Sequence, residues 1–102
     1  MNKTVYISIG NSDDKLTQRE WAGFVEEVRQ GIRNLAYPMH GEWFSANESP
    51  YQNACWCVEV RPVMVDRLKE RMGSIAKAYR QGSIAWAEAN TEFLAPESGV
   101  GT

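Results

Sequence analysis

Hydrophobic and polar positions alternate regularly in residues 51–61, near the middle of the chain. From residue 55 to residue 60, every second position carries a β-branched or aromatic side chain, and the positions between carry small or polar ones. The two sets are Trp56, Val58 and Val60 on one side, and Cys55, Cys57 and Glu59 on the other. A period of two over such residues is typical of a strand with one buried face. We therefore expect a strand with one apolar face and one small or polar face.

Three further segments carry strand signals. Residues 4–9 alternate, so that Tyr6 and Ser8 share one face. A strand over about 38–45 follows a Tyr-Pro break, and a loop rich in Asn, Ser and Pro joins it to the central strand as a hairpin. Residues 83–88 predict the last strand.

Two segments have the 3.6-residue period of amphipathic helices. The first spans about 18–34, and Thr17 and Glu20 have the spacing of a capping box at its start. The second spans about 63–80, directly after Pro62, which fits the first turn of a helix.

The order strand, helix, strand, strand, helix, strand predicts an α+β fold of the ferredoxin-like split βαβ type. Right-handed crossovers give a four-stranded antiparallel sheet in the order 4-1-3-2, with both helices on one face. We expect one domain over residues 1–95 and a flexible tail over 96–102, which is rich in Gly and small residues. The second sheet face is left open, and we place any binding function there.

The register of the hairpin decides which side chains reach the open face. We expect Trp43 opposite Ala54 and Gly41 opposite Trp56, because this register keeps apolar side chains inward. A one-residue slip would put Glu42 in the core. The candidate binding residues on the open face are Tyr6, Ser8, His40, Glu42, Phe44, Cys55, Cys57, Glu59, Arg61 and Trp86.

Composition and charge narrow the function classes. The chain has 102 residues, 43% of them hydrophobic and 24% charged, which is ordinary for a soluble domain. A net charge of -2 does not favour non-specific binding to nucleic acid or to anionic membranes. No apolar run reaches the length of a membrane span, and we identify no secretory signal. The two cysteines lie too close along one strand for an unstrained disulfide, so we expect reduced thiols and a cytoplasmic protein.

Metal binding and catalysis are alternatives for the open face. His40, Glu42, Cys55 and Cys57 are residue types that ligate metals, but a Cys-x-Cys on a flat strand is not a zinc-knuckle turn. His40 beside Cys57 would suggest an activated thiolate, and no oxyanion hole is evident in the sequence. We therefore expect no metal and no cofactor, and we assign no catalytic residue.

RNA binding is a further alternative. Val5, Tyr6 and Ile7 resemble the first strand of RNA-recognition modules, with Tyr6 facing outward. Cys55 and Cys57, however, stand where those modules stack aromatic rings on bases. We therefore do not expect nucleic acid as the partner.

A broader resemblance rests on four strings of the chain. They are YISIGNSDDKL at residues 6–16, GEWFS at 41–45, QNACWC at 52–57 and SIAWAE at 83–88. These strings are similar to small uncharacterised proteins of actinobacteria and their phages. The resemblance implies no known activity, and it favours a small accessory or phage-encoded interaction protein over a housekeeping enzyme.

Two function classes follow. The first is a non-enzymatic module that binds a host or phage protein through its open sheet face. The second is a small-molecule site, enzymatic or sensory, like that of the cofactor-independent enzymes of the dimeric α+β-barrel type, which is an analogy of architecture alone.

The last strand bears on self-association. Alternation allows either Ile84 and Trp86 or Ala85 and Ala87 to face the helices. Because the core already holds many bulky side chains, we expect the alanines to face the helices, so that Ile84 and Trp86 emerge beside Tyr6 on the open face. An apolar surface of this kind usually meets a partner. The simplest partner is a second copy, and we expect a homodimer that packs sheet against sheet about a two-fold axis.

Overall fold

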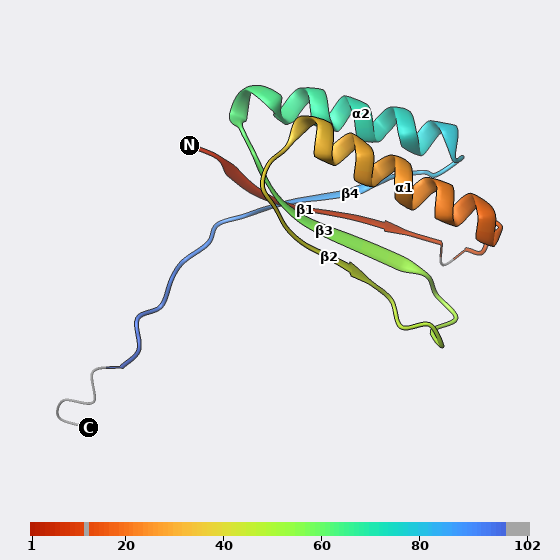
Figure 1. Cartoon of the computed structure of the whole chain (residues 1–102), viewed down its shortest axis with the longest axis horizontal. Coiled ribbons are helices and arrows are strands. Elements are labelled where there is room, and N and C mark those ends of the chain that lie inside the picture. The colour runs from red at the N-terminus through yellow and green to blue at the C-terminus, as the bar shows by residue number, and fades with distance from the viewer. Residues whose placement is uncertain (12, 98–102) are drawn as a thin grey trace.

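In the computed structural model, which describes residues 1–11 and 13–97, strands and helices follow the expected order (Figure 1). The elements are β1 (Lys3–Gly10), α1 (Gln18–Leu35), β2 (Met39–Phe44), β3 (Asn53–Val60), the 3-10 turn η1 (Pro62–Met64), α2 (Val65–Ala78) and β4 (Ala85–Ala89). The expectation of a flexible tail over 96–102 falls mostly on residues 98–102, which lie outside the described residues.

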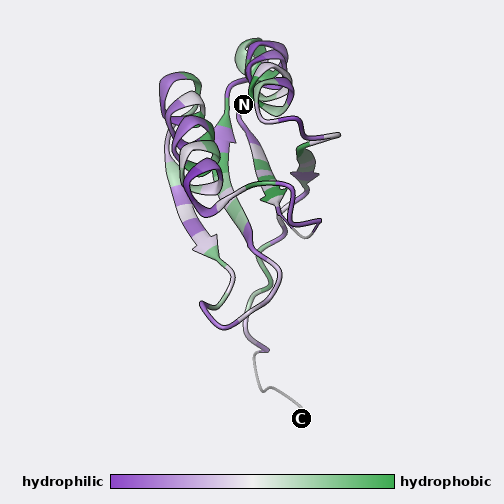
Figure 2. Ribbon diagram, turned by 90° about the vertical axis from the view of Figure 1, so that its right-hand side faces the viewer, coloured by the Kyte–Doolittle hydropathy of each residue, from purple (hydrophilic) through white to green (hydrophobic). Residues whose placement is uncertain are grey.

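The strands form one antiparallel sheet with β3 and β1 at its centre. Its order is β2-β3-β1-β4, which reads 4-1-3-2 from the β4 edge. Both helices lie on the same side of the sheet (Figures 1 and 2). The expected α+β class, with a four-stranded antiparallel sheet and two helices, is confirmed. In the described part of the chain, no helix combines the length and the apolar character needed to cross a membrane.

The hydrophobic core lies between the sheet and the helices. Its fully buried side chains include Trp56, Phe24, Ile7, Leu16, Ile32, Leu68 and Ile75. The start of α1 is fixed by the expected capping box. The backbone N–H of Glu20 donates to the Thr17 hydroxyl at 3.1 Å, and the backbone N–H of Thr17 donates to the Glu20 carboxylate at 3.0 Å. Two otherwise unpaired donors at the helix start are thereby satisfied.

The pairing of β2 with β3 contains a bulge that the sequence did not predict. Met39 lies opposite Val58, but Gly41 lies opposite Cys57 instead of Trp56. His40 is therefore an additional residue in β2, and the register changes by one position beyond it.

The bulge reverses the faces of the residues that follow it. Glu42 lies opposite Trp56 on the helix side of the sheet, and Phe44 packs edge-on against the same indole at 6.4 Å. Trp43 faces the open side instead. The expected orientations of Glu42, Trp43 and Phe44 were therefore wrong. Glu42 is tolerated inside because it accepts hydrogen bonds from Trp56 Nε1 and from Arg29 Nε, each at 2.6 Å.

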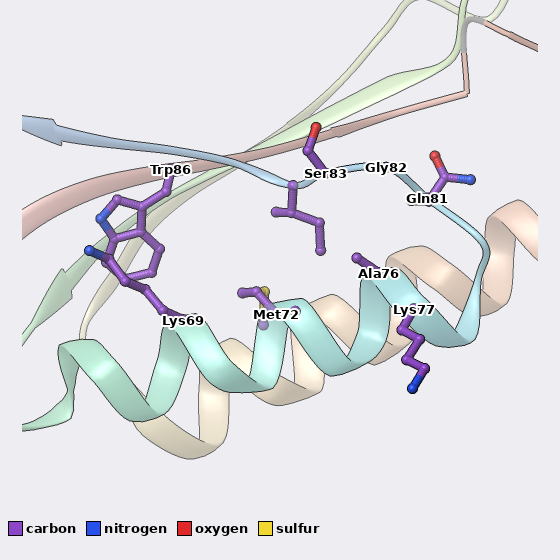
Figure 3. A pocket seen from close by; sticks show the side chains of 10 residues that line it. Lys69, Met72, Ala76, Lys77, Gln81, Gly82, Ser83 and Trp86 are labelled. Atoms are coloured by element: carbon purple, nitrogen blue, oxygen red, sulfur yellow. The ribbon is translucent and has the colours of Figure 1, made fainter.

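The orientation of β4 also differs from the expectation. Trp86 lies opposite Ile7, which is fully buried, and together with Ile84 it packs against the core on the helix side. Ala85 and Ala87 are exposed on the open face. The expectation that Trp86 contributes to the open face was wrong, because α2 leaves room for the indole beside the short edge strand (Figure 3).

Candidate functional site

The open face of the sheet still gathers most of the side chains that the sequence singled out. Those on this face are Tyr6, Ser8, His40, Cys55, Cys57 and Glu59. Glu42, Phe44 and Trp86 lie on the helix side. Arg61 follows the end of β3 and lines a separate hollow with Arg33 and Asn34. The observed set of residues on the open face is therefore smaller than the predicted set, and its members come from β1, β2 and β3.

A hollow of about 510 Å³ lies on this face. It is lined by Thr4, Tyr6, His40, Cys57, Glu59, Thr91 and Phe93. Thr91 and Phe93 come from the segment after β4. Sequence reasoning did not place them at the site, because an exposed segment without regular structure carries no periodicity that fixes its position.

The polar side of the hollow is a short hydrogen-bonded network. The Thr4 hydroxyl donates to Glu59 Oε2 at 2.7 Å, and His40 Nε2 lies 2.9 Å from the same oxygen. The hydrogen bond from Thr4 lowers the pKa of Glu59, and the bond with His40 adds to this effect, against the opposing effect of burial. Glu59 is therefore a carboxylate at neutral pH, and it orients the imidazole of the bulge residue.

The apolar side of the site is aromatic. Tyr6 is 40% exposed, and its interaction with the Cys57 thiol raises its pKa, so the phenol keeps its proton at neutral pH. Trp43 is 53% exposed and lies opposite Cys55. Its indole covers Gly41 so closely that a Cβ at that glycine would meet the ring at 2.4 Å. The sequence did not predict Trp43 on the open face, because no residue type indicates the bulge that turns its side chain outward.

Small side chains occupy the surface between these rings. Cys55 is partly buried and Cys57 is buried, and both are free thiols. Ala85 and Ala87 extend the same low surface onto β4. Small side chains between two exposed aromatic rings let a second surface approach the sheet closely.

The groups gathered here can take part in recognition. The site offers an imidazole, a carboxylate, hydroxyls and two aromatic rings, and these groups can donate, accept and pack. Among residues 1–11 and 13–97, no three metal-ligating side chains lie close enough together to hold an ion. Comparison of the chain with protein-family models and with curated proteins gives no match.

Proposed function

We propose that the protein is a small binding module that docks a partner protein on the open face of its sheet. The observation that carries this proposal is the pair of exposed aromatic side chains, Tyr6 and Trp43, on strands separated by β3 alone. Two strand spacings and an offset of two residues along the strands place their backbones about 12 Å apart. Aromatic rings on a rigid sheet supply large contact areas with little loss of side-chain entropy, and such residues dominate binding energy at many interfaces.

The surroundings of the two rings support the same function. Ser8, His40 and Glu59 provide hydrogen-bonding groups around the low centre formed by the cysteines. An apolar centre within a polar margin is the usual anatomy of a protein interface. The element order supports assignment to the ferredoxin-like fold, in which the face opposite the helices is free for contacts. The resemblance of four strings of the chain to small actinobacterial and phage proteins leads us to propose a host or phage protein as the partner, in the cytoplasm.

Affinity capture from a lysate of the source cells tests this proposal. Three baits are compared: the wild type, Trp43→Ala, and Tyr51→Ala. Tyr51 is a matched control because it is 59% exposed but lies in the β2–β3 loop. We expect the wild type and Tyr51→Ala to capture the same protein, and Trp43→Ala to lose it.

The location of the contact is checked by alkylation of the thiol of Cys55 at the centre of the face. In the complex its rate of alkylation should fall at least tenfold. A partner that leaves this rate unchanged, or that all three baits capture equally, contradicts docking at the open face.

A second candidate function is favoured by the hollow itself. His40, Glu59 and Thr4 converge at one end of a 510 Å³ space with Tyr6 on its wall, and sites for small molecules have this size and mixture of groups. We propose as the alternative a small-molecule site, of the kind used by cofactor-independent enzymes of the dimeric α+β-barrel type. A thermal-shift screen of metabolites should then raise the melting temperature of the wild type but not of His40→Gln. No shift with any compound would argue against it.

A further inference from the structure

A groove of about 650 Å³ lies on the helix side of the sheet, between α2 and β4 (Figure 3). Its floor is apolar and consists of Met72, Ala76, Ile84 and Trp86. Lys69 lies at the Trp86 end, with its ammonium 5.2 Å from the centre of the indole, and Lys77 lies towards the other end of α2. The groove therefore has an apolar floor with the Lys69 ammonium at one end, and Lys77 lines it with its ammonium pointing away from β4 (Figure 3).

The outer backbone edge of β4 borders this groove. Within the described residues, β4 pairs with β1 on one side and with no strand on the other. An edge strand beside an apolar channel can receive an extended chain, because main-chain groups of the strand pair with the added segment.

The same molecule carries an extended segment without a partner of its own. We call residues 90–97, with the sequence NTEFLAPE, the post-β4 segment. It leaves β4 and runs away from the sheet (Figure 1). Phe93 is 92% exposed and Leu94 is 82% exposed, with Glu92 before them and Glu97 after them. Two adjacent large apolar side chains in water are an unfavourable arrangement that a partner surface relieves.

We propose that the post-β4 segment of one copy occupies the α2–β4 groove of a second copy, and the reverse, in a two-fold exchange. The apolar pair Phe93 and Leu94 matches the apolar floor, and the flanking glutamates carry the charge opposite to that of the two lysines that line the groove. Lys69 and Lys77 are about 12 Å apart along the helix axis, since a helix rises about 1.5 Å per residue. Glu92 and Glu97 are about 16 Å apart in an extended chain, and long side chains bridge the difference.

The path of the chain favours a second copy over the segment's own groove. Thr91 and Phe93 line the hollow on the open face, whereas the groove lies on the helix side. The segment therefore lies on the opposite side of the sheet from its own groove. A two-fold exchange of identical elements needs no such crossing, and it closes the assembly at two copies. This interface differs from the sheet-against-sheet dimer expected from the sequence, and it leaves the open face free for the proposed partner.

Light scattering on the full-length chain and three variants tests the exchange. Phe93→Asp with Leu94→Asp disables the segment. Gly73→Glu places a charged side chain in the groove, because Gly73 lines it, and we expect the fold to be kept because a Cβ there meets no atom within 4 Å. Gly73→Ala is the matched control. We expect twice the mass of one chain for the wild type and Gly73→Ala, and the mass of one chain for the other two.

A mixing experiment separates this exchange from other dimers. When the segment variant and the Gly73→Glu variant are combined, one intact segment can enter one intact groove, and we expect a mixed dimer to reappear. Three outcomes would overturn the proposal: a wild type with the mass of one chain at about 100 μM, a dimer that survives both disabling changes, and a mixture that remains single chains. A wild type with the mass of one chain would show that the post-β4 segment stays beside the open-face hollow of its own chain.

Discussion

The carboxylate of Glu42 accepts a hydrogen bond of 2.6 Å from the indole N–H of Trp56, on the helix side of the sheet. The same oxygen accepts a second bond of 2.6 Å from Arg29 on α1. Because Trp56 is fully buried, its N–H needs an acceptor within the protein. In the register without a bulge, Glu42 would face the open side and could not accept this hydrogen bond. The bulge at His40 thus gives the buried indole N–H of Trp56 its acceptor, and it also turns Trp43 towards the open face.

Loss of the Glu42 carboxylate should destabilise the fold. In Glu42→Ala, the buried indole N–H and the guanidinium of Arg29 both lose an acceptor, and we expect a decrease of about 1–3 kcal/mol in the free energy of unfolding. Glu26→Ala is the control, because Glu26 pairs with the same arginine at the exposed surface. It should change stability by less than about 0.5 kcal/mol. Urea unfolding measures the stability of both variants. Equal unfolding midpoints for Glu42→Ala and Glu26→Ala would refute the role of Glu42.

The same carboxylate should make stability depend on pH. Burial alone raises the pKa of Glu42, but hydrogen bonds from Arg29 and Trp56 outweigh it, so the pKa is lowered in the folded state. A lowered pKa stabilises the fold above the pKa of the unfolded chain, about 4.3 for Glu. This contribution is lost as pH falls through the folded pKa.

The difference in unfolding free energy between wild type and Glu42→Gln is the measurement. It should be largest above about pH 4.3 and should shrink as the solution is acidified. A difference that is constant from pH 7 to pH 2 would show that the carboxylate charge makes no contribution.

The turn between β1 and α1 should depend on Asn11. This side chain is 3% exposed, accepts a hydrogen bond from the backbone N–H of Leu16, and donates to its carbonyl, each at 3.0 Å. Asn11→Ala leaves both buried backbone groups unpaired, and we expect a loss of about 1–3 kcal/mol. Asp13→Ala, which removes an exposed bond to the backbone of Lys15, should cost less than about 0.5 kcal/mol. Comparable losses in denaturant unfolding would contradict this account of the turn.

Gly41 should hold the position of Trp43 on the open face. A methyl group at residue 41 would meet the indole at 2.4 Å, so Gly41→Ala forces the ring away from the sheet. Acrylamide should then quench the tryptophan fluorescence more strongly, and partner binding should weaken. Gly82→Ala is the control, since a Cβ there meets no atom within 4 Å. Unchanged quenching in Gly41→Ala would mean that the indole does not rest on this glycine.

The elements and their order could be predicted from the sequence because their signals are local. The capping box at Thr17 and Glu20 and the alternation around Trp56 each specify structure within a few residues. The face of Trp43 could not be predicted, because one additional residue at His40 shifts the register and no residue type marks it. The choice depends on Arg29, which reaches Glu42 only after α1 has packed on the sheet.

In the candidate site, too, some residues could be placed from the sequence and others could not. Tyr6, Cys57 and Glu59 lie on the two central strands, where plain alternation assigns the face. In β4, alternation separates Trp86 from its alanine neighbours but does not say which side faces the helices. The room beside α2 decides that, and it is a property of the packed domain.

Trp43 is the proposed anchor for a partner protein on the open face of the sheet. The most direct test is a binding titration of the captured partner against wild type, Trp43→Ala and Tyr51→Ala. Truncation of an anchoring aromatic costs 1.4 kcal/mol or more, so we expect the affinity of Trp43→Ala to fall by about tenfold or more. Tyr51→Ala should bind like the wild type. Equal affinities for the wild type and Trp43→Ala would contradict an anchoring role for Trp43.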